Sequence, residues 1–143
     1  TVRTLASLGV GRVQLNFTRP VEVDGQWRRD VIVPLDVCGP EIRKALKTAR
    51  SLGMVGETEA VPLCHLDEGD RGGADVFEDF SRHEVADVHR QEVDLTEHRR
   101  ANRPKAPQCE GCDLVGHCPT TWAMYLALFG TDELRPVRAT AAP

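Results

Sequence analysis

The feature of this sequence that most constrains its fold is a group of three cysteines in a short stretch bracketed by prolines. Cys109, Cys112 and Cys118 have the spacing C-x2-C-x5-C and lie between Pro107 and Pro119. Three thiolates this close together repel one another in water, so they are plausible together only around a cation that neutralises them. The first expectation is therefore a fold that holds a metal centre at this stretch.

Two glycines and a fourth cysteine extend this expectation. Gly111 lies in the two-residue gap, where a tight turn can aim both sulfurs at one metal or cluster edge, and Gly116 permits a second reversal in the longer gap. A fourth ligand is still needed. Cys64, at the end of a predicted strand, is the first candidate, and Cys38, in a predicted loop before a helix, is the second.

The residues leave more than one chemistry open. Four thiolates around iron describe a [4Fe–4S] cluster, which is the favoured interpretation because its ligand spacings vary. Thiolates with His65 or His117 as a nitrogen ligand suit structural zinc, although zinc sites usually show two cysteine pairs and only one is present. A Cys109–Cys112 disulfide is disfavoured, because a redox C-x-x-C should open a helix after a strand. Unrelated free thiols are the remaining alternative.

Charge and length exclude several classes of protein. A chain of 143 residues is enough for one domain with a hydrophobic core. The net charge of -4, from 18 basic and 22 acidic residues, gives no electrostatic reason to bind nucleic acid or a membrane. No stretch approaches the ~20 apolar residues of a membrane-spanning helix.

Cysteine usage and the first residues give two further expectations. Five cysteines are an odd number and are clustered, which suits metal ligation in a reducing compartment, so a cytoplasmic location is expected. The chain begins with Thr1 rather than Met, and its first residues already resemble the middle of a fold. We therefore expect a trimmed chain or one piece of a longer protein.

The first half of the chain predicts alternating helices and strands. The expected order is a helix ending near Gly9, a strand at 11–17, a loop at 18–30, an extended segment at 30–36, a helix from Pro40 to Gly53 and a strand at 54–64. This order is typical of βα units around a parallel sheet. Because a parallel sheet needs helices on both faces, the pattern implies missing neighbours before Thr1 or a partner chain.

The second half is less regular. Residues 65–98 have no clean period and predict two short strands or a hairpin, and residues 96–103 predict a short helix with Thr96 as its N-cap. Trp122, Tyr125 and Phe129 then lie at helical spacing before Gly130. They predict a final helix whose aromatic stripe packs in the core.

Several other side chains are weighed for function. Asn16 lies near the end of the first strand and Arg19 follows it, at the end where barrel enzymes bind ligands. Both are tentative contacts for a cosubstrate or substrate, with a solvated loop residue as the alternative for Arg19. Glu57 and Glu59 are expected on a surface strand face rather than in an interior. The basic run at 97–105 is expected to be a solvated helix face, with charge compensation for an anionic cluster as the alternative.

The segment at 107–137 resembles the C-terminal end of many radical S-adenosylmethionine enzymes. These often close with C-x2-C-x5-C, an aromatic helix and an ending similar to "YG..EL.P", here "FGTDELRP". The segments "LGVGRVQLNFTRP" and "VPLC" also resemble the closing βα units of that family's partial barrel. The resemblance covers nearly the whole chain and is weakest at 66–98.

What the resemblance implies is an α/β fold with two parts. Residues 1–65 would be the C-terminal portion of a partial (β/α) barrel, and residues 66–143 a small α+β auxiliary-cluster subdomain of the twitch or SPASM type. A full SPASM domain carries two clusters and more cysteines, so a single-cluster, twitch-like subdomain is the better match. Its implied ligands are Cys64, Cys109, Cys112 and Cys118, while Cys38 has no counterpart.

The sequence also departs from this family. The C-x3-C-x2-C loop, which holds the cluster that cleaves S-adenosylmethionine, is absent from these residues. Radical generation would therefore fall to a missing N-terminal barrel region or a partner chain. The family often has glycine soon after the last cysteine, where this chain has Pro119 and Thr120.

The resemblance implies an activity for the complete enzyme. It would cleave S-adenosylmethionine reductively and abstract hydrogen from a peptide or small-molecule substrate, with electrons from a donor such as a ferredoxin or flavodoxin. The auxiliary [4Fe–4S] cluster would serve electron transfer, substrate positioning or structure. A non-catalytic iron–sulfur electron-transfer or scaffold module, and a zinc-stabilised binding domain, are the alternative functions.

Overall fold

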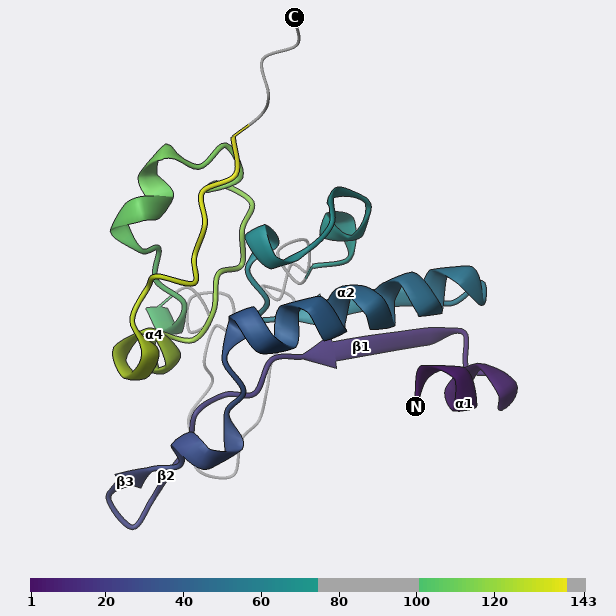
Figure 1. Ribbon diagram of the computed structural model, residues 1–143, viewed down its shortest axis with the longest axis horizontal. Coiled ribbons are helices and arrows are strands. Elements are labelled where there is room, and N and C mark those ends of the chain that lie inside the picture. The colour runs from purple at the N-terminus through teal and green to yellow at the C-terminus, as the bar shows by residue number, and fades with distance from the viewer. Residues whose placement is uncertain (75–100, 139–143) are drawn as a thin grey trace, which may run out of the picture.

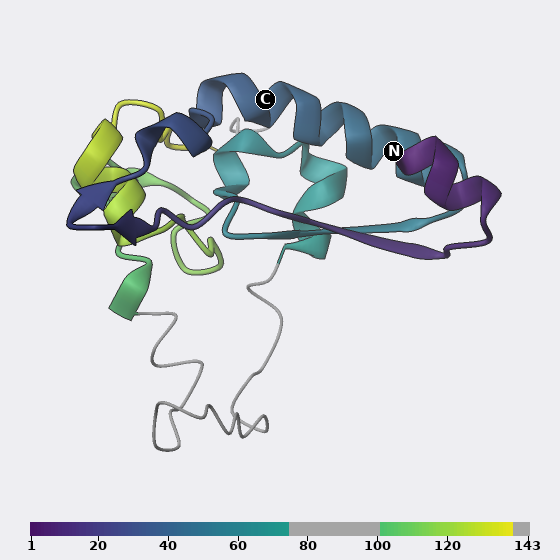
Figure 2. The same ribbon diagram turned by 90° about the horizontal axis from the view of Figure 1, so that it is seen from below.

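The centre of the molecule is a strand–helix–strand unit. The structure, a computed structural model, describes residues 1–74 and 101–138. Strands β1 (Arg12–Asn16) and β4 (Val55–Glu59) pair in parallel, and helix α2 (Leu35–Ser51) connects them in the chain. Figure 2 shows α2 lying along one side of the two strands. This is the βα order that the sequence predicts for residues 11–59.

The two faces of this small sheet differ in polarity. On the face toward α2, a Cβ added at Gly56 would lie 2.8 Å from Cδ2 of Leu46, so the helix packs closely on the sheet. The opposite face carries polar side chains, including the ion pair of Arg12 with Glu57, whose Nη1 and Oε1 atoms lie 2.5 Å apart. The described strands form two two-stranded sheets and no closed barrel.

The remaining described elements are short. They are α1 (Val2–Ser7), β2 (Glu22–Val23), β3 (Gln26–Trp27), α4 (Ala123–Phe129) and the 3-10 helices η1 (Arg29–Val31), η2 (Leu63–His65), η3 (Glu68–Gly73) and η6 (Pro107–Gly111). Strands β2 and β3 form a small antiparallel hairpin that projects from the body (Figure 1), within the stretch predicted to be a loop. Helices α1 and α4 end before Gly9 and Gly130, as the sequence predicts.

Helix α2 corrects one prediction, because it begins at Leu35 rather than at Pro40. Pro40 lies inside the helix, where it lacks the N–H for one backbone hydrogen bond. The helix start is held from elsewhere in the chain. The Leu35 N–H donates to Tyr125 Oη at 2.8 Å, and the Asp36 N–H donates to Glu133 Oε1 at 3.1 Å. A cap from residues so distant leaves no local sequence signal.

The hydrophobic core joins the two halves of the chain. Tyr125 is fully buried, its ring lies 5.0 Å from that of Phe17 in an edge-to-face arrangement, and it stacks on Phe129 at 4.8 Å. The expectation that the aromatic stripe packs in the core is confirmed. Core residues come from both sides of the predicted boundary at residue 65, among them Leu35 and Leu134.

Other predictions fall at the edge of the described residues or beyond it. Residues 65–74 form the end of η2 and the 3-10 helix η3, with an isolated parallel bridge between Thr58 and Ala74. The two short strands or hairpin predicted at 65–98 are therefore not seen at 65–74, and residues 75–98, with most of the helix predicted at 96–103, lie outside the described residues. In the described part of the chain, no helix is long and apolar enough to cross a membrane.

Candidate metal centre

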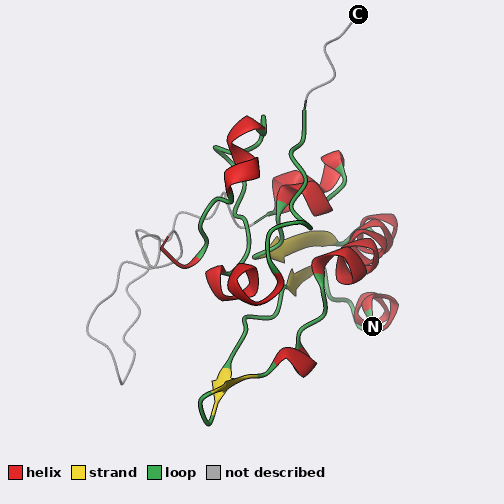
Figure 3. Ribbon diagram, turned by 60° about the vertical axis from the view of Figure 1, so that its left-hand side comes forward, coloured by secondary structure: helices red, strands yellow, loops and turns green. Residues whose placement is uncertain are grey.

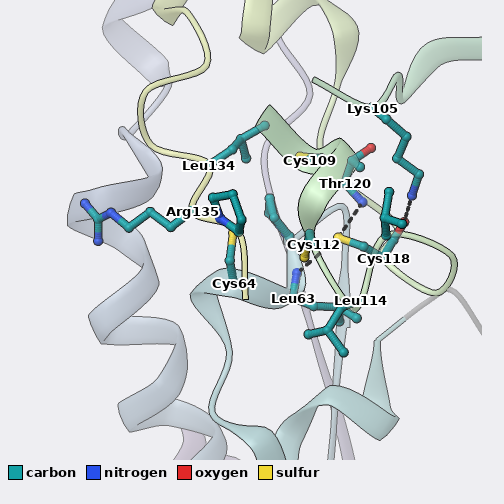
Figure 4. A pocket seen from close by; sticks show the side chains of 13 residues that line it. Leu63, Cys64, Lys105, Cys109, Cys112, Leu114, Cys118, Thr120, Leu134 and Arg135 are labelled. Atoms are coloured by element: carbon teal, nitrogen blue, oxygen red, sulfur yellow. Dashed lines mark hydrogen bonds between the residues drawn. The ribbon is translucent and has the colours of Figure 1, made fainter. Parts of the chain in front are cut away.

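Four cysteines line one cavity. They are Cys64, Cys109, Cys112 and Cys118, the four residues that the sequence proposes as ligands. Figure 4 shows their sulfur atoms on the wall of the cavity. The fold therefore brings Cys64 to the same place as a cysteine stretch far along the chain.

The other lining residues are mostly apolar. They are Pro62, Leu63, Leu114, Val115, Leu134 and Pro136, together with Lys105, Thr120 and Arg135. The segments that supply them are loops and short helices rather than regular sheet (Figure 3). An apolar wall around thiols suits a buried thiolate centre, because it limits the access of water.

Cys64 is fixed by what surrounds it in the chain. Strand β4 ends at Glu59, so the prediction that the strand continues to residue 64 is wrong. Ala60 has a positive φ of 58°, which turns the chain away from the sheet. The side chains of Val61 and Leu63 are then buried in the core, at 0% and 2% exposure. These anchors place Cys64 at the cavity.

Backbone amides point at the cysteine sulfurs. The N–H groups of Leu63 and Thr120 each donate to Cys118 Sγ at 3.4 Å. The Val137 N–H donates to Cys112 Sγ at 3.3 Å. Hydrogen bonds of this kind stabilise negative charge on sulfur and tune metal–thiolate sites. Negative charge on Cys112 or Cys118 would therefore meet backbone N–H donors.

Burial opposes ionisation of the same thiols. Burial raises the pKa of Cys64, and backbone donation from Arg135 only partly offsets this. Burial likewise raises the pKa of Cys118, against the lowering effects of its two amide donors and of Lys105. Burial therefore favours the neutral thiol form of both cysteines, and a bound metal cation would favour the thiolate form instead.

Thr120, two residues after the last cysteine, has an unusual backbone conformation. Its φ is +54°, in the left-handed region that glycine adopts most readily. Its hydroxyl donates to the Arg103 carbonyl at 2.9 Å, and the residue is only 1% exposed. A β-branched residue in this conformation stores about 1–3 kcal/mol of strain, and such strain collects at functional sites.

The alternative ligands lie outside the cavity wall. Cys38 sits in α2, where burial raises its pKa to about 11. Nε2 of His65 lies 2.8 Å from the carbonyl oxygen of Glu133, and burial lowers the pKa of this histidine. His117 is exposed. All five cysteines are free thiols, so the Cys109–Cys112 disulfide is not formed.

A single metal ion and an iron–sulfur cluster need different placements of their donors. Within residues 1–74 and 101–138, no three His, Cys, Asp or Glu side chains are placed to hold one metal ion. Tetrahedral zinc needs its donors about 2.0–2.3 Å from one point. A [4Fe–4S] cluster instead gives each cysteine its own iron, so the sulfurs stand further apart around a larger space.

Asn16 and Arg19 do not belong to the cysteine cavity. Asn16 is exposed at the C-terminal end of β1, opposite Glu59 in the strand register. The guanidinium of Arg19 lies 5.5 Å from the centroid of the Trp122 ring. Neither residue lines the cavity. Their suggested role toward S-adenosylmethionine or substrate therefore concerns a separate place, at the end of the strands.

Arg103 contradicts the prediction for the basic run. The sequence predicts a solvated face, but Arg103 is 6% exposed. Its guanidinium pairs with Glu59 at 3.1 Å and lies 4.1 Å from the centroid of Trp122. Both partners are distant in sequence, so only the position directly before Pro104 hinted at a constrained backbone.

Comparisons with known proteins add no family to this description. No protein-family model, no curated protein and no solved structure matches the chain. The features that point to a function are the cysteine motif, the residues around it and the cavity that they line.

Proposed function

We propose that this chain is the C-terminal part of a radical S-adenosylmethionine enzyme and holds an auxiliary [4Fe–4S] cluster through Cys64, Cys109, Cys112 and Cys118. The observation that carries the proposal is the single cavity lined by these four cysteines, which come from separate segments of the chain. The sequence motif supports the same assignment, because it joins C-x2-C-x5-C to an aromatic helix and the ending "FGTDELRP".

The donor set favours one kind of role for the cluster. Four cysteine ligands leave no iron with an open position, so electron transfer or structural support is favoured over direct ligation of substrate. Substrate, a peptide or a small molecule, would bind elsewhere, and Asn16 and Arg19 at the end of β1 are the candidates here. Radical generation belongs to a barrel region outside these residues, fed by a donor such as a ferredoxin or flavodoxin. A reducing, cytoplasmic compartment suits thiolate ligation.

A cluster-bearing module without catalysis of its own is the second candidate function. It is favoured by one observation, the absence of a C-x3-C-x2-C motif from these residues. The coding sequence upstream of Thr1 separates the two candidates. A C-x3-C-x2-C motif there supports the enzyme, and its absence both there and in any partner chain supports the module.

Anaerobic reconstitution with iron and sulfide tests the proposal directly. We expect about four irons and four sulfides per chain and a broad absorption shoulder near ~400 nm, typical of thiolate-bound iron–sulfur centres. The matched control is Cys38→Ala, which removes a cysteine outside the cavity and should bind the same amount of iron. A colourless protein that takes up one zinc ion would contradict the proposal.

A further inference from the structure

Cys118 is held differently from the other three cysteines of the cavity. Its sulfur accepts two backbone N–H groups, from Leu63 and Thr120, each at 3.4 Å. Its carbonyl oxygen accepts a hydrogen bond from the Lys105 ammonium group, and Lys105 itself lines the cavity (Figure 4). Partial and full positive charges thus gather around one of the four sulfurs.

The backbone at this place is built to keep Lys105 there. The Thr120 hydroxyl donates to the carbonyl of Arg103, two residues before Lys105, while the Lys105 side chain reaches back to Cys118. Two side-chain bonds therefore tie the segment at 103–105 to the segment at 118–120. In this arrangement the φ of Thr120 is +54°, which is a strained value for a β-branched residue. Strain retained at a buried residue beside a candidate ligand points to a functional constraint.

Lys105 differs from the other cation on the cavity wall. Arg135 also lines the cavity, but its side chain extends away from the cysteines toward α2 (Figure 4). There its Nη2 pairs with Asp36 Oδ2 at 2.6 Å. Lys105 makes no ion pair with any acidic side chain in the described residues. Among residues 1–74 and 101–138, no acidic side chain neutralises the charge that Lys105 places beside the cavity.

We propose that Lys105 raises the reduction potential of a cluster held by the four cysteines, and that Thr120 positions it beside Cys118. The proposal rests on the proposed function. Reduction adds one electron to the cluster, taken from an added reductant that is oxidised by the same one electron. A fixed cation nearby stabilises the more negative, reduced form over the oxidised form. Lys105 would then make this centre easier to reduce than the same cysteines alone.

The role of Lys105 is tested by a redox titration of the reconstituted chain. Dithionite is the reductant, and electron paramagnetic resonance measures the reduced cluster at each potential. Lys105→Gln removes the charge but keeps a hydrogen-bond donor. We expect it to lower the ratio of reduced to oxidised cluster at a fixed potential by up to about tenfold, which is ~59 mV for a one-electron couple. Lys105→Arg should restore the wild-type potential. Lys47→Met, which removes an exposed lysine of α2, should leave it unchanged.

The outcomes separate this inference from the proposed function. A wild-type chain that takes up no cluster overturns both. A chain that binds four irons, but whose potential is the same in wild type, Lys105→Gln and Lys47→Met, overturns only the role of Lys105. Lys105→Met is the second neutral variant. If both neutral variants lose iron while Lys105→Arg keeps it, Lys105 holds the cluster rather than tunes it, and the inference is wrong.

Discussion

Two parts of this molecule are held together by different means. The helix-cap cluster, formed by Leu35, Tyr125 and Glu133, is a packed arrangement in which the buried Tyr125 hydroxyl bonds to the Glu133 carboxylate and accepts the Leu35 N–H. The four-cysteine cavity is surrounded by loops whose amides point at sulfur atoms. The first part satisfies its polar groups with protein partners. In the proposed function, the second part also needs a cation that neutralises the thiolates.

One segment of the chain serves both parts. Glu133 caps α2, Leu134 packs in the core and lines the cavity, and Val137 donates its N–H to Cys112. The "DELRP" ending therefore has a structural reason beyond its resemblance to a family. It connects the helix-cap cluster to the cavity. The stability of the two parts should nevertheless depend on metal to different extents.

Metal removal should produce the largest difference between the two parts. When a chelator strips the reconstituted protein under reducing conditions, we expect amide protection to fall strongly at residues 105–120, because the unpaired thiolates lose their cation. Protection in β1, α2 and β4 should remain. Hydrogen exchange followed by mass spectrometry measures both regions in one sample. Equal loss of protection in both regions would show that the parts are not independent in this way.

Tyr125 should be the most sensitive residue of the helix-cap cluster. Tyr125→Ala removes a fully buried ring and its stacking on Phe129, and is expected to lower the free energy of unfolding by about 3–5 kcal/mol. Tyr125→Phe removes only the hydroxyl that accepts the Leu35 N–H, and should cost about 1–2 kcal/mol. Urea denaturation of the metal-loaded protein gives both values. Similar losses in the two variants would contradict the importance of ring packing.

A substitution at Gly39, in α2, should have a smaller effect on stability than one at Tyr125. A Cβ at this position would lie 2.9 Å from Nδ1 of His65, the neighbour of Cys64 in the chain. Gly39→Ala is therefore expected to displace His65 and to lower the free energy of unfolding by about 1–3 kcal/mol, outweighing the better helix propensity of alanine. Gly72→Ala, with nothing within 4 Å, is the matched control for urea denaturation. An equal change in the free energy of unfolding in both variants would mean that His65 moves aside without cost.

Local sequence patterns predict the helices and strands of this fold better than they predict where each one begins and ends. The alternation of Val13 and Leu15 gives β1, and the apolar face around Leu46 gives the body of α2. The start of α2 was missed because its cap comes from Tyr125 and Glu133, which no local pattern connects to Leu35. Whether the strand–helix–strand unit belongs to a partial barrel stays a prediction.

The candidate site divides in the same way. The spacing of Cys109, Cys112 and Cys118 is a local signal, and it indicates a metal centre without any structure. Cys64 was inferred only from its position at the end of a predicted strand, and the fold places it at the same cavity. The burial of Arg103 could not be predicted, because it depends on contacts with distant residues.

The most direct test of the central claim is the iron content of Cys64→Ala and Cys38→Ala after anaerobic reconstitution, with Cys112→Ala as a reference for a lost ligand. Both single replacements remove a half-buried cysteine outside the C-x2-C-x5-C stretch, but only Cys64 lines the cavity. We predict wild-type iron in Cys38→Ala and loss of most iron in Cys64→Ala, as in Cys112→Ala. Wild-type iron in Cys64→Ala, with loss in Cys38→Ala, would contradict the four-cysteine centre.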